Sequence, residues 1–320
     1  MAAKDEKPKE EKPKAKDEKS SAAKARWHTQ LAGRLAQYRL PLMIGTIVLF
    51  IGGVIGLWRK FGGEIESQRA DKYLVTLAGL EVTPQPAWIP TDIRGEVYQD
   101  AGWEQKRPSI LETDLTVRIA QAFEQHTWVA KMSRVTKHHP ARVVVDLQYR
   151  RPVAMVEVDY QGQSGLLPID SLGVLLPPED FQAEAAVKFP RITVDYSGPE
   201  GSVGTPWGDA RVAGGAAIAG LLVDNWEALG LYRIVALAGT AGASTDAPQY
   251  ELHTRSGSRV LWGHAPEAET TGEAKALLKC QQLAAYVQQN GSLAAQEEPV
   301  VVDIRQQHEV SVRPEDSTRR

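Results

Sequence analysis

Residues 126–154 read HTWVAKMSRVTKHHPARVVVDLQYRRPVA and decide how the middle of the chain folds. Residues 128–136 are rich in strand-forming side chains. In residues 142–149 apolar and polar side chains alternate with a period of two, which places the apolar ones on one face of a strand. Residues 138–141, His-His-Pro-Ala, carry the proline typical of a turn. The stretch therefore predicts an antiparallel β-hairpin.

A strand and two helices are predicted before this hairpin. Residues 73–82 are rich in β-forming residues, and Thr91 is a suitable N-cap for a short helix. A second helix is predicted from the capping-box spacing of Ser109–Glu112 to about Gln125. The order β-α-α-β-β predicts a compact α+β layer over residues 70–152.

An apolar run lies far upstream of these elements. Residues 42–58, LMIGTIVLFIGGVIGLW, carry no charge, and the 17 residues span about 25 Å as a helix, close to the ~30 Å hydrocarbon core of a membrane. We therefore expect one transmembrane helix over residues 40–60. Basic residues are denser before the run than after it, which predicts a cytoplasmic N-terminus and an extracytoplasmic C-terminal part. A cleaved signal peptide is the main alternative, but it would start nearer the N-terminus.

The first 39 residues are rich in lysine with interspersed acids, and have almost no large apolar side chain before Trp27. Such a segment buries too little apolar surface to offset the entropy of ordering it, so we expect a disordered cytoplasmic tail. The formal net charge of −3 argues against a nucleic-acid surface on the folded part. Cys280 is the one cysteine, which excludes an intrachain disulfide and favours core packing over a catalytic thiol.

Residues 153–313 predict a β-rich domain with flanking helices, followed by a short tail over residues 314–320. A hairpin is expected over Tyr250–Gly263, and a closing strand pair over residues 300–312. A helix is expected from about Pro266 to Gln289. The predicted buried positions on this helix are Leu277, Cys280, Ala284 and Val287, and those on an earlier small-residue helix are Ile218, Leu221, Leu222 and Trp226. Taken together, the fold class is α+β.

The central stretch resembles the end of a POTRA domain and, more narrowly, the FtsQ/DivIB proteins of bacterial cell division. The matching residues are Trp128-Val129, Pro140 and Arg151-Pro152-Val153-Ala154. Residues 166–177, 188–192 and 300–305 resemble later segments of that family. The order of tail, membrane helix, POTRA-like domain, β-domain and short tail is also the same.

The resemblance implies a non-catalytic bitopic scaffold of the divisome in the cell inner membrane, with its C-terminal domains in the periplasm at the septum. It also implies that small single-pass partners of the FtsB/FtsL type dock on the last sheet. Carried onto this chain, the expected partner-binding residues are Arg305, Val310, Ser311 and Val312. The alternative is that Val310 and Val312 only fill the core.

No catalytic, cofactor-binding or metal-binding residue is predicted. The histidines form no His-Glu-x-x-His motif, and Gly162-Gln-Ser-Gly165 lacks the spacing of a nucleophile elbow. We therefore expect protein partners and neither nucleic acid nor a small-molecule substrate. Three alternatives stay open: a POTRA-bearing envelope protein of a transport or assembly system, a membrane-anchored envelope hydrolase, and a signalling anchor whose tail binds a cytoplasmic effector.

Overall fold

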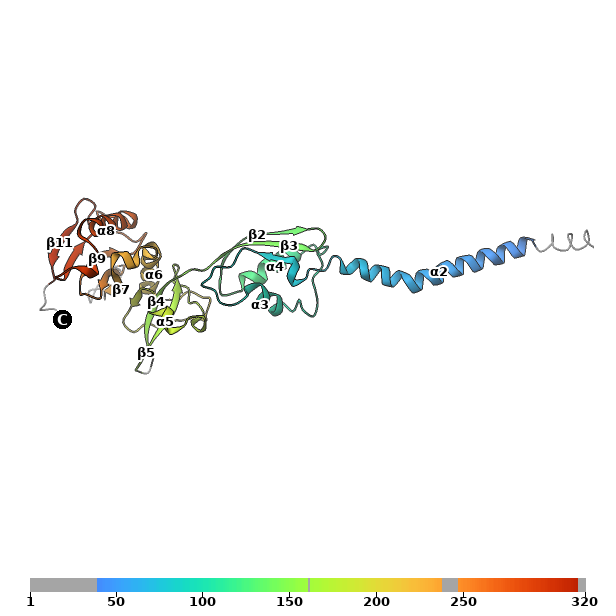
Figure 1. The fold of residues 1–320 in the computed structure, drawn as a ribbon, viewed down its shortest axis with the longest axis horizontal. Coiled ribbons are helices and arrows are strands. Elements are labelled where there is room, and N and C mark those ends of the chain that lie inside the picture. Colours follow the sequence, from blue (N-terminus) through green and yellow to red (C-terminus); the bar gives the residue numbers. More distant parts are fainter. Residues whose placement is uncertain (1–38, 161, 238–246, 316–320) are drawn as a thin grey trace, which may run out of the picture. The chain divides into compact units, whose positions relative to one another are not determined.

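The computed structural model describes residues 39–160, 162–237 and 247–315. The chain divides into two compact units, residues 1–72 and 73–320. In the first unit, α2 spans Arg39–Asp71 (Figure 1). Of the described residues, Met43–Lys60 is the one stretch of helix long and apolar enough, by length and composition, to cross a membrane or to serve as a signal sequence. The predicted tail, apart from Arg39, lies outside the described residues.

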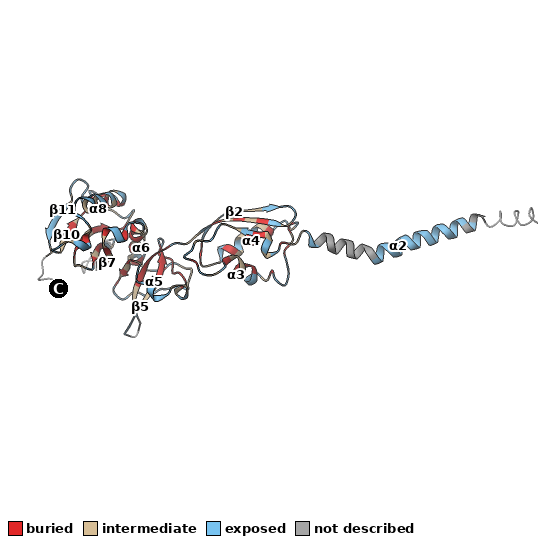
Figure 2. Ribbon diagram, in the orientation of Figure 1, coloured by how far each residue is buried: buried red, intermediate tan, exposed pale blue. Residues whose placement is uncertain are grey.

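The second unit begins with a small sheet covered by two helices. Its elements are β1 (Leu80–Val82), α3 (Ile93–Asp100), α4 (Leu115–Glu124), β2 (Val129–His138) and β3 (Arg142–Tyr149). The strand order is β1-β3-β2, with β1 parallel and β2 antiparallel to β3. The predicted order β-α-α-β-β is confirmed. Leu115, Ile119 and Phe123 of α4 are fully buried with Val143 and Val145 of β3, so one face of this sheet packs on helices (Figure 2).

Two boundaries in this region differ from the prediction. The first strand is shorter, because Leu77–Gly79 form a 3₁₀ turn (η1) before β1 begins. Helix α4 begins after Asp114, and Ser109–Glu112 instead form a separate turn in which the Ser109 N–H donates to Glu112 Oε1 at 2.8 Å. Glu112 thus accepts the backbone hydrogen bond expected of a capping box, but no helix begins at Ser109. The motif alone therefore placed the helix start too early.

The remaining strands form an eight-stranded mixed sheet in the order β11-β10-β9-β8-β7-β6-β4-β5. They are β4 (Pro152–Tyr160), β5 (Gln163–Asp170), β6 (Arg191–Thr193), β7 (Leu231–Leu237), β8 (Gln249–Thr254), β9 (Arg259–His264), β10 (Val300–Asp303) and β11 (Ser311–Pro314). The helices between them are η2 (Pro178–Asp180), α5 (Ala183–Ala186), α6 (Ala210–Leu222), α7 (Trp226–Leu229), α8 (Ala276–Asn290) and η3 (Leu293–Ala295). The predicted hairpin and closing strand pair are confirmed as β8–β9 and β10–β11.

One row of apolar side chains crosses the whole sheet. The pairing registers place one residue from each strand opposite the next, in the sequence Leu167, Val156, Ile192, Ile234, Leu252, Val260, Val302 and Val312. The six from Val156 to Val302 are fully buried in the same core as residues of α6 and α8. This row therefore marks the helix-covered face, and the side chains one position away along each strand point to the opposite face.

Two helices bury different residues from those predicted. Helix α8 begins at Ala276, ten residues later than expected, and residues 265–275 form a loop instead. Leu277 is 70% exposed, whereas Lys279 is fully buried. On α6 and α7, Ile218, Leu222 and Trp226 are buried as predicted, but Leu221 is 38% exposed.

Candidate interaction surface at the C-terminal sheet edge

Strand β11 forms one edge of the eight-stranded sheet. It pairs with β10 on one side, and among the described residues no strand pairs with its other side. All four of its residues are exposed. Val312, the last member of the apolar row, is 47% exposed, although its neighbour Val302 is fully buried. The row thus ends in an apolar side chain that its own fold leaves half covered.

The main-chain groups of β11 alternate in direction. The Glu315 N–H donates to the Pro299 carbonyl at 2.9 Å, just beyond the pair formed by Val300 and Pro314. In an antiparallel ladder the hydrogen-bonded pairs recur every second residue, so the N–H and C=O of Val312 point away from β10. The carbonyl of Pro314 points the same way, but proline has no N–H and adds no donor to this edge. Val312 therefore presents a main-chain donor and acceptor at the edge, and no other described strand pairs with them.

The structure separates the four predicted partner-binding residues. Ser311 and Val312 lie on the exposed edge strand. Val310, before the strand, is partly buried against the core, which matches the alternative reading for this residue. Arg305 lies after β10 and pairs with Asp303, with an Nη2–Oδ2 distance of 2.6 Å. Burial raises the pKa of Asp303, but hydrogen bonds from Arg305 outweigh that effect and leave the pKa below its usual value.

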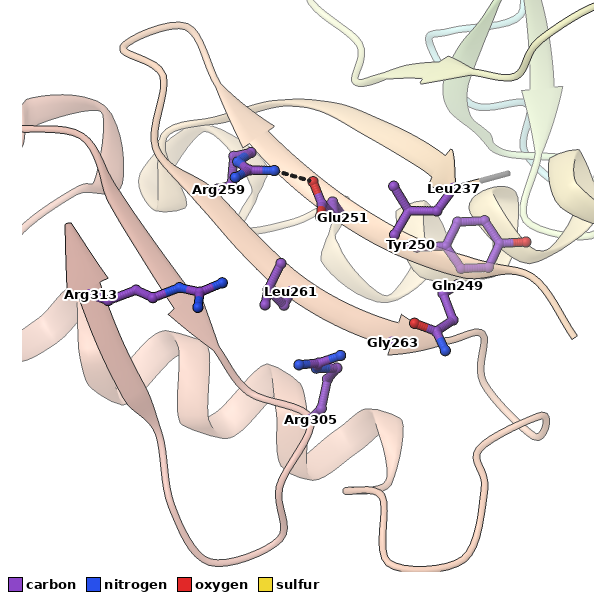
Figure 3. Close-up of a pocket in the computed structure, with 9 residues that line it drawn as sticks. All are labelled: Leu237, Gln249, Tyr250, Glu251, Arg259, Leu261, Gly263, Arg305 and Arg313. Atoms are coloured by element: carbon purple, nitrogen blue, oxygen red, sulfur yellow. Dashed lines mark hydrogen bonds and ion pairs between the residues drawn. The ribbon is translucent and has the colours of Figure 1, made fainter. Parts of the chain in front are cut away.

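A cavity of about 140 Å³ lies beside the edge strand, on the face opposite α8. Figure 3 shows Arg313 and Arg305 on either side of Leu261, with Glu251 and Arg259 pointing toward each other. Arg259 Nη1 lies 3.1 Å from Glu251, and Arg259 Nη2 lies 2.7 Å from Glu315, which ties the end of β11 to β9. Hydrogen bonds from His253 and Arg259 hold the pKa of Glu251 below its usual value.

Sequence reasoning missed Arg259 and Arg313, which line this cavity. They come together because Arg259 lies opposite Val301 on one side and Arg313 lies opposite Val301 on the other. The signal in the sequence is the alternation of charged and apolar residues at Arg259-Val260 and Val312-Arg313. That alternation predicts that the arginine side chains point away from the core face of the sheet. Only the order of the strands shows that the two arginines lie on either side of the same residue, Val301.

A buried charged group supports the same end of the sheet. Lys279 of α8 is fully buried, and its Nζ lies 2.6 Å from Glu273 Oε1 and 3.3 Å from the His264 carbonyl. His264 Nδ1 lies 2.6 Å from Glu273 Oε2, and the His264 N–H donates to Glu273 Oε1 at 2.8 Å. We call Lys279, Glu273 and His264 the buried ion cluster. Buried charges are tolerated only when paired and hydrogen-bonded, as they are here.

The buried ion cluster holds the loop between β9 and α8 against the connection from β10 to β11. The Ala274 N–H donates to the Arg305 carbonyl at 2.7 Å, and Gln307 Nε2 donates to the Glu273 carbonyl at 3.3 Å. Burial raises the pKa of Glu273, but hydrogen bonds from Lys279 and His264 more than offset this and hold its pKa at about 2. With Lys279 fully buried, this arrangement suits stability, not proton exchange with a substrate.

Comparison of the chain with protein-family models and with curated proteins gives no match. Within the part of the chain that the structure describes, no group of three or more His, Cys, Asp or Glu side chains could hold a metal ion. The surface around β11 is therefore characterised by its geometry alone: a strand edge that no described strand covers, a half-exposed valine and an arginine-lined cavity.

Proposed function

We propose that this protein is a bitopic scaffold of the FtsQ/DivIB type, which links cell-division proteins at the septum through extracytoplasmic contacts. Three features support the proposal. Residues 126–154 resemble that family, α2 is long and apolar enough to span a membrane, and the β-α-α-β-β order of the small sheet is that of a POTRA domain. On this proposal β4–β11 form the β-domain, and the N-terminus of the chain is cytoplasmic.

The single observation that carries the docking mechanism is the open edge at Val312. An added strand would pair with the outward N–H and C=O of Val312 and cover its half-exposed side chain. Each main-chain hydrogen bond formed in this way contributes about 0.5–1.5 kcal/mol, and covering the valine adds a hydrophobic contribution. β11 is therefore the part of the sheet best suited to accept a partner by strand addition.

The charges beside the edge indicate the chemistry of the partner strand. Arg313 makes no ion pair with any described residue, and it lines the cavity with Arg305. A partner with an apolar residue facing Val312 and an acidic residue facing Arg313 would complement both faces of β11. Small single-pass proteins of the FtsB/FtsL type are the partners that the family resemblance implies.

A membrane-anchored hydrolase finds less support. The buried ion cluster contains a histidine–carboxylate pair, but its hydrogen bonds point inward around the fully buried Lys279. A POTRA-bearing protein of another envelope system would share the open edge and differ in its partner, so a binding experiment with defined partners separates the two proposals.

The test uses the full-length protein in neutral detergent and the small coiled-coil division proteins of the same host. Val312→Pro removes the outward N–H without breaking a hydrogen bond to β10, and we expect it to weaken binding by about tenfold or more. Val312→Thr keeps the N–H and the branched shape, and is expected to bind within a few-fold of the wild type.

Two results would contradict the proposal in different ways. If Val312→Pro binds like the wild type with its fold intact, the interface lies elsewhere and strand addition at β11 is rejected. If the wild-type protein binds none of these partners, the divisome assignment itself is rejected.

A further inference from the structure

The two sheets of the second unit are joined along the chain by a very short linker. Strands β3 and β4 are separated by Arg150 and Arg151 alone. Each residue of a linker has two soft backbone dihedrals, so a linker without further contacts would let the two sheets swivel. Residues 73–320 nevertheless form one compact unit. Contacts elsewhere in the chain therefore hold the two sheets together.

The connection between β5 and β6 returns to the small sheet and supplies part of its core. Leu176 is fully buried in the same cluster of side chains as Phe123 of α4 and Trp128, which lies just before β2. Phe181 packs against this cluster, with its ring centre 6.1 Å from that of Trp128. Two apolar side chains that follow β5 of the eight-stranded sheet thus complete the core of the small sheet.

A hydrogen bond fixes the direction of this contact. Trp128 is buried, and its Nε1–H donates to Asp180 Oδ2 at 2.8 Å. A buried indole N–H needs an acceptor, and Asp180 at the end of η2 supplies it. We call Leu176, Asp180 and Phe181 the clasp, because these three residues of the β5–β6 connection hold Trp128 beside the small sheet.

An ion pair ties the linker to the same connection. Arg150 Nη1 lies 2.7 Å from Asp170 Oδ2, and both side chains are largely buried. The other oxygen of this carboxylate accepts the N–H groups of Leu172 and Val174, both at 2.9 Å, and so shapes the turn that precedes the clasp. The pair therefore couples the position of the linker to the position of the clasp.

The main chain of the linker is held by the small-sheet side. The Arg150 N–H donates to the Trp128 carbonyl at 2.8 Å, and the Arg150 carbonyl accepts the Trp88 Nε1–H at 3.1 Å. Arg150 is thus bonded through its main chain to residues around the small sheet and through its guanidinium to the end of β5. With these bonds in place, the linker has little freedom left for a swivel.

We propose that the clasp acts as a conformational lock, which makes the two sheets move as one rigid body while it is docked and lets them swivel about Arg150 and Arg151 when it is released. Asp180 and Phe181 are only partly buried, so the clasp lies near the surface. A partner that binds β11 is then held in a fixed orientation to the small sheet. The inference holds whichever partner binds there, because it concerns contacts within the chain.

The test measures the distance between the two sheets in the full-length protein in neutral detergent. Nitroxide labels are placed at two exposed positions, Lys131 of β2 and Gln288 of α8, in a Cys280→Ser background, and double electron–electron resonance gives the distance distribution. We expect one narrow distribution when the clasp is intact. Asp180→Ala combined with Phe181→Ala is expected to widen it about twofold or more, because parts joined only by a short linker move relative to each other by default.

Two variants serve as matched controls, and both are expected to keep the narrow distribution. Leu172→Ala removes an exposed apolar side chain of the same connection outside the clasp, and Asp180→Asn keeps an oxygen that can accept the Trp128 N–H. A broad distribution in the wild type would overturn the proposal, and so would a narrow one in the double variant with unchanged circular dichroism. If the double variant loses the fold of the small sheet, Asp180→Ala alone decides: losing one hydrogen bond should widen the distribution less, and an unchanged width overturns the proposal.

Discussion

The two edges of the eight-stranded sheet differ in how the chain closes them. At β5, Pro168 has no N–H, its carbonyl accepts the Leu176 N–H at 2.9 Å, and Ile169 forms a bridge with Leu175. At β11, the outward N–H and C=O of Val312 have no strand beside them within the described residues. An open edge is a template for another strand, and proteins usually cover such edges.

The side chains at the two ends of the apolar row show the same difference. Leu167 of β5 packs against the core, whereas Val312 of β11 is 47% exposed. The chain itself therefore covers the apolar row at its β5 end, whereas the last side chain of the row stays half exposed at the β11 end. This difference favours β11 over β5 as the edge that a partner completes.

The largest expected effect concerns what holds the β11 end in place. Lys279→Met leaves Glu273 buried without its cation, and breaking a buried pair from one side lowers the free energy of unfolding by about 3–5 kcal/mol. Denaturant unfolding of the full-length protein measures the loss. Because the buried ion cluster contacts the connection from β10 to β11, amide exchange should quicken in these strands more than in β4 and β5.

The matched control for this change removes both charges. Lys279→Met combined with Glu273→Gln is expected to recover a large part of the lost stability, because no unpaired charge remains buried. Equal loosening of β4–β5 and β10–β11 in the single variant would contradict a local role for the cluster.

A second prediction concerns acid stability. Hydrogen bonds from Lys279 and His264, working against burial, lower the pKa of Glu273 from 4.5 to about 2 in the folded protein. Because this pKa is lower in the folded than in the unfolded protein, ionised Glu273 makes its full contribution to the free energy of unfolding above pH 4.5. That contribution is lost as the pH falls from 4.5 to about 2. The loss amounts to about 3 kcal/mol. Glu273→Gln should be less stable at neutral pH and show a flatter decline in this window, as measured by denaturant unfolding at several pH values.

The strand framework could be predicted from sequence because it depends on local patterns. The alternation in Arg142–Tyr149 predicted β3, and the hairpin expected over Tyr250–Gly263 is formed by β8 and β9. Helix starts were harder, since the Ser109–Glu112 motif forms an isolated turn and residues 265–275 form a loop around Glu273. The helix periodicity placed Leu277 inside, but the burial of Lys279 depends on partners in other elements.

The candidate site could be predicted only in part. Ser311 and Val312 were placed on the last strand, and that strand does lie at a sheet edge. Val310 packs against the core, whereas Val312 ends the apolar row and is half exposed, and spacing in the sequence does not reveal this difference.

The most direct test of the open edge is amide hydrogen exchange of the full-length protein with and without its bound coiled-coil division partner. We predict that the Val312 amide becomes strongly protected on binding, while the amides of Ser164 and Leu166 on the β5 edge keep their exchange rates. Protection at Ser164 and Leu166 with no change at Val312 would contradict the account, because the partner would then complete the edge that the chain already closes in part.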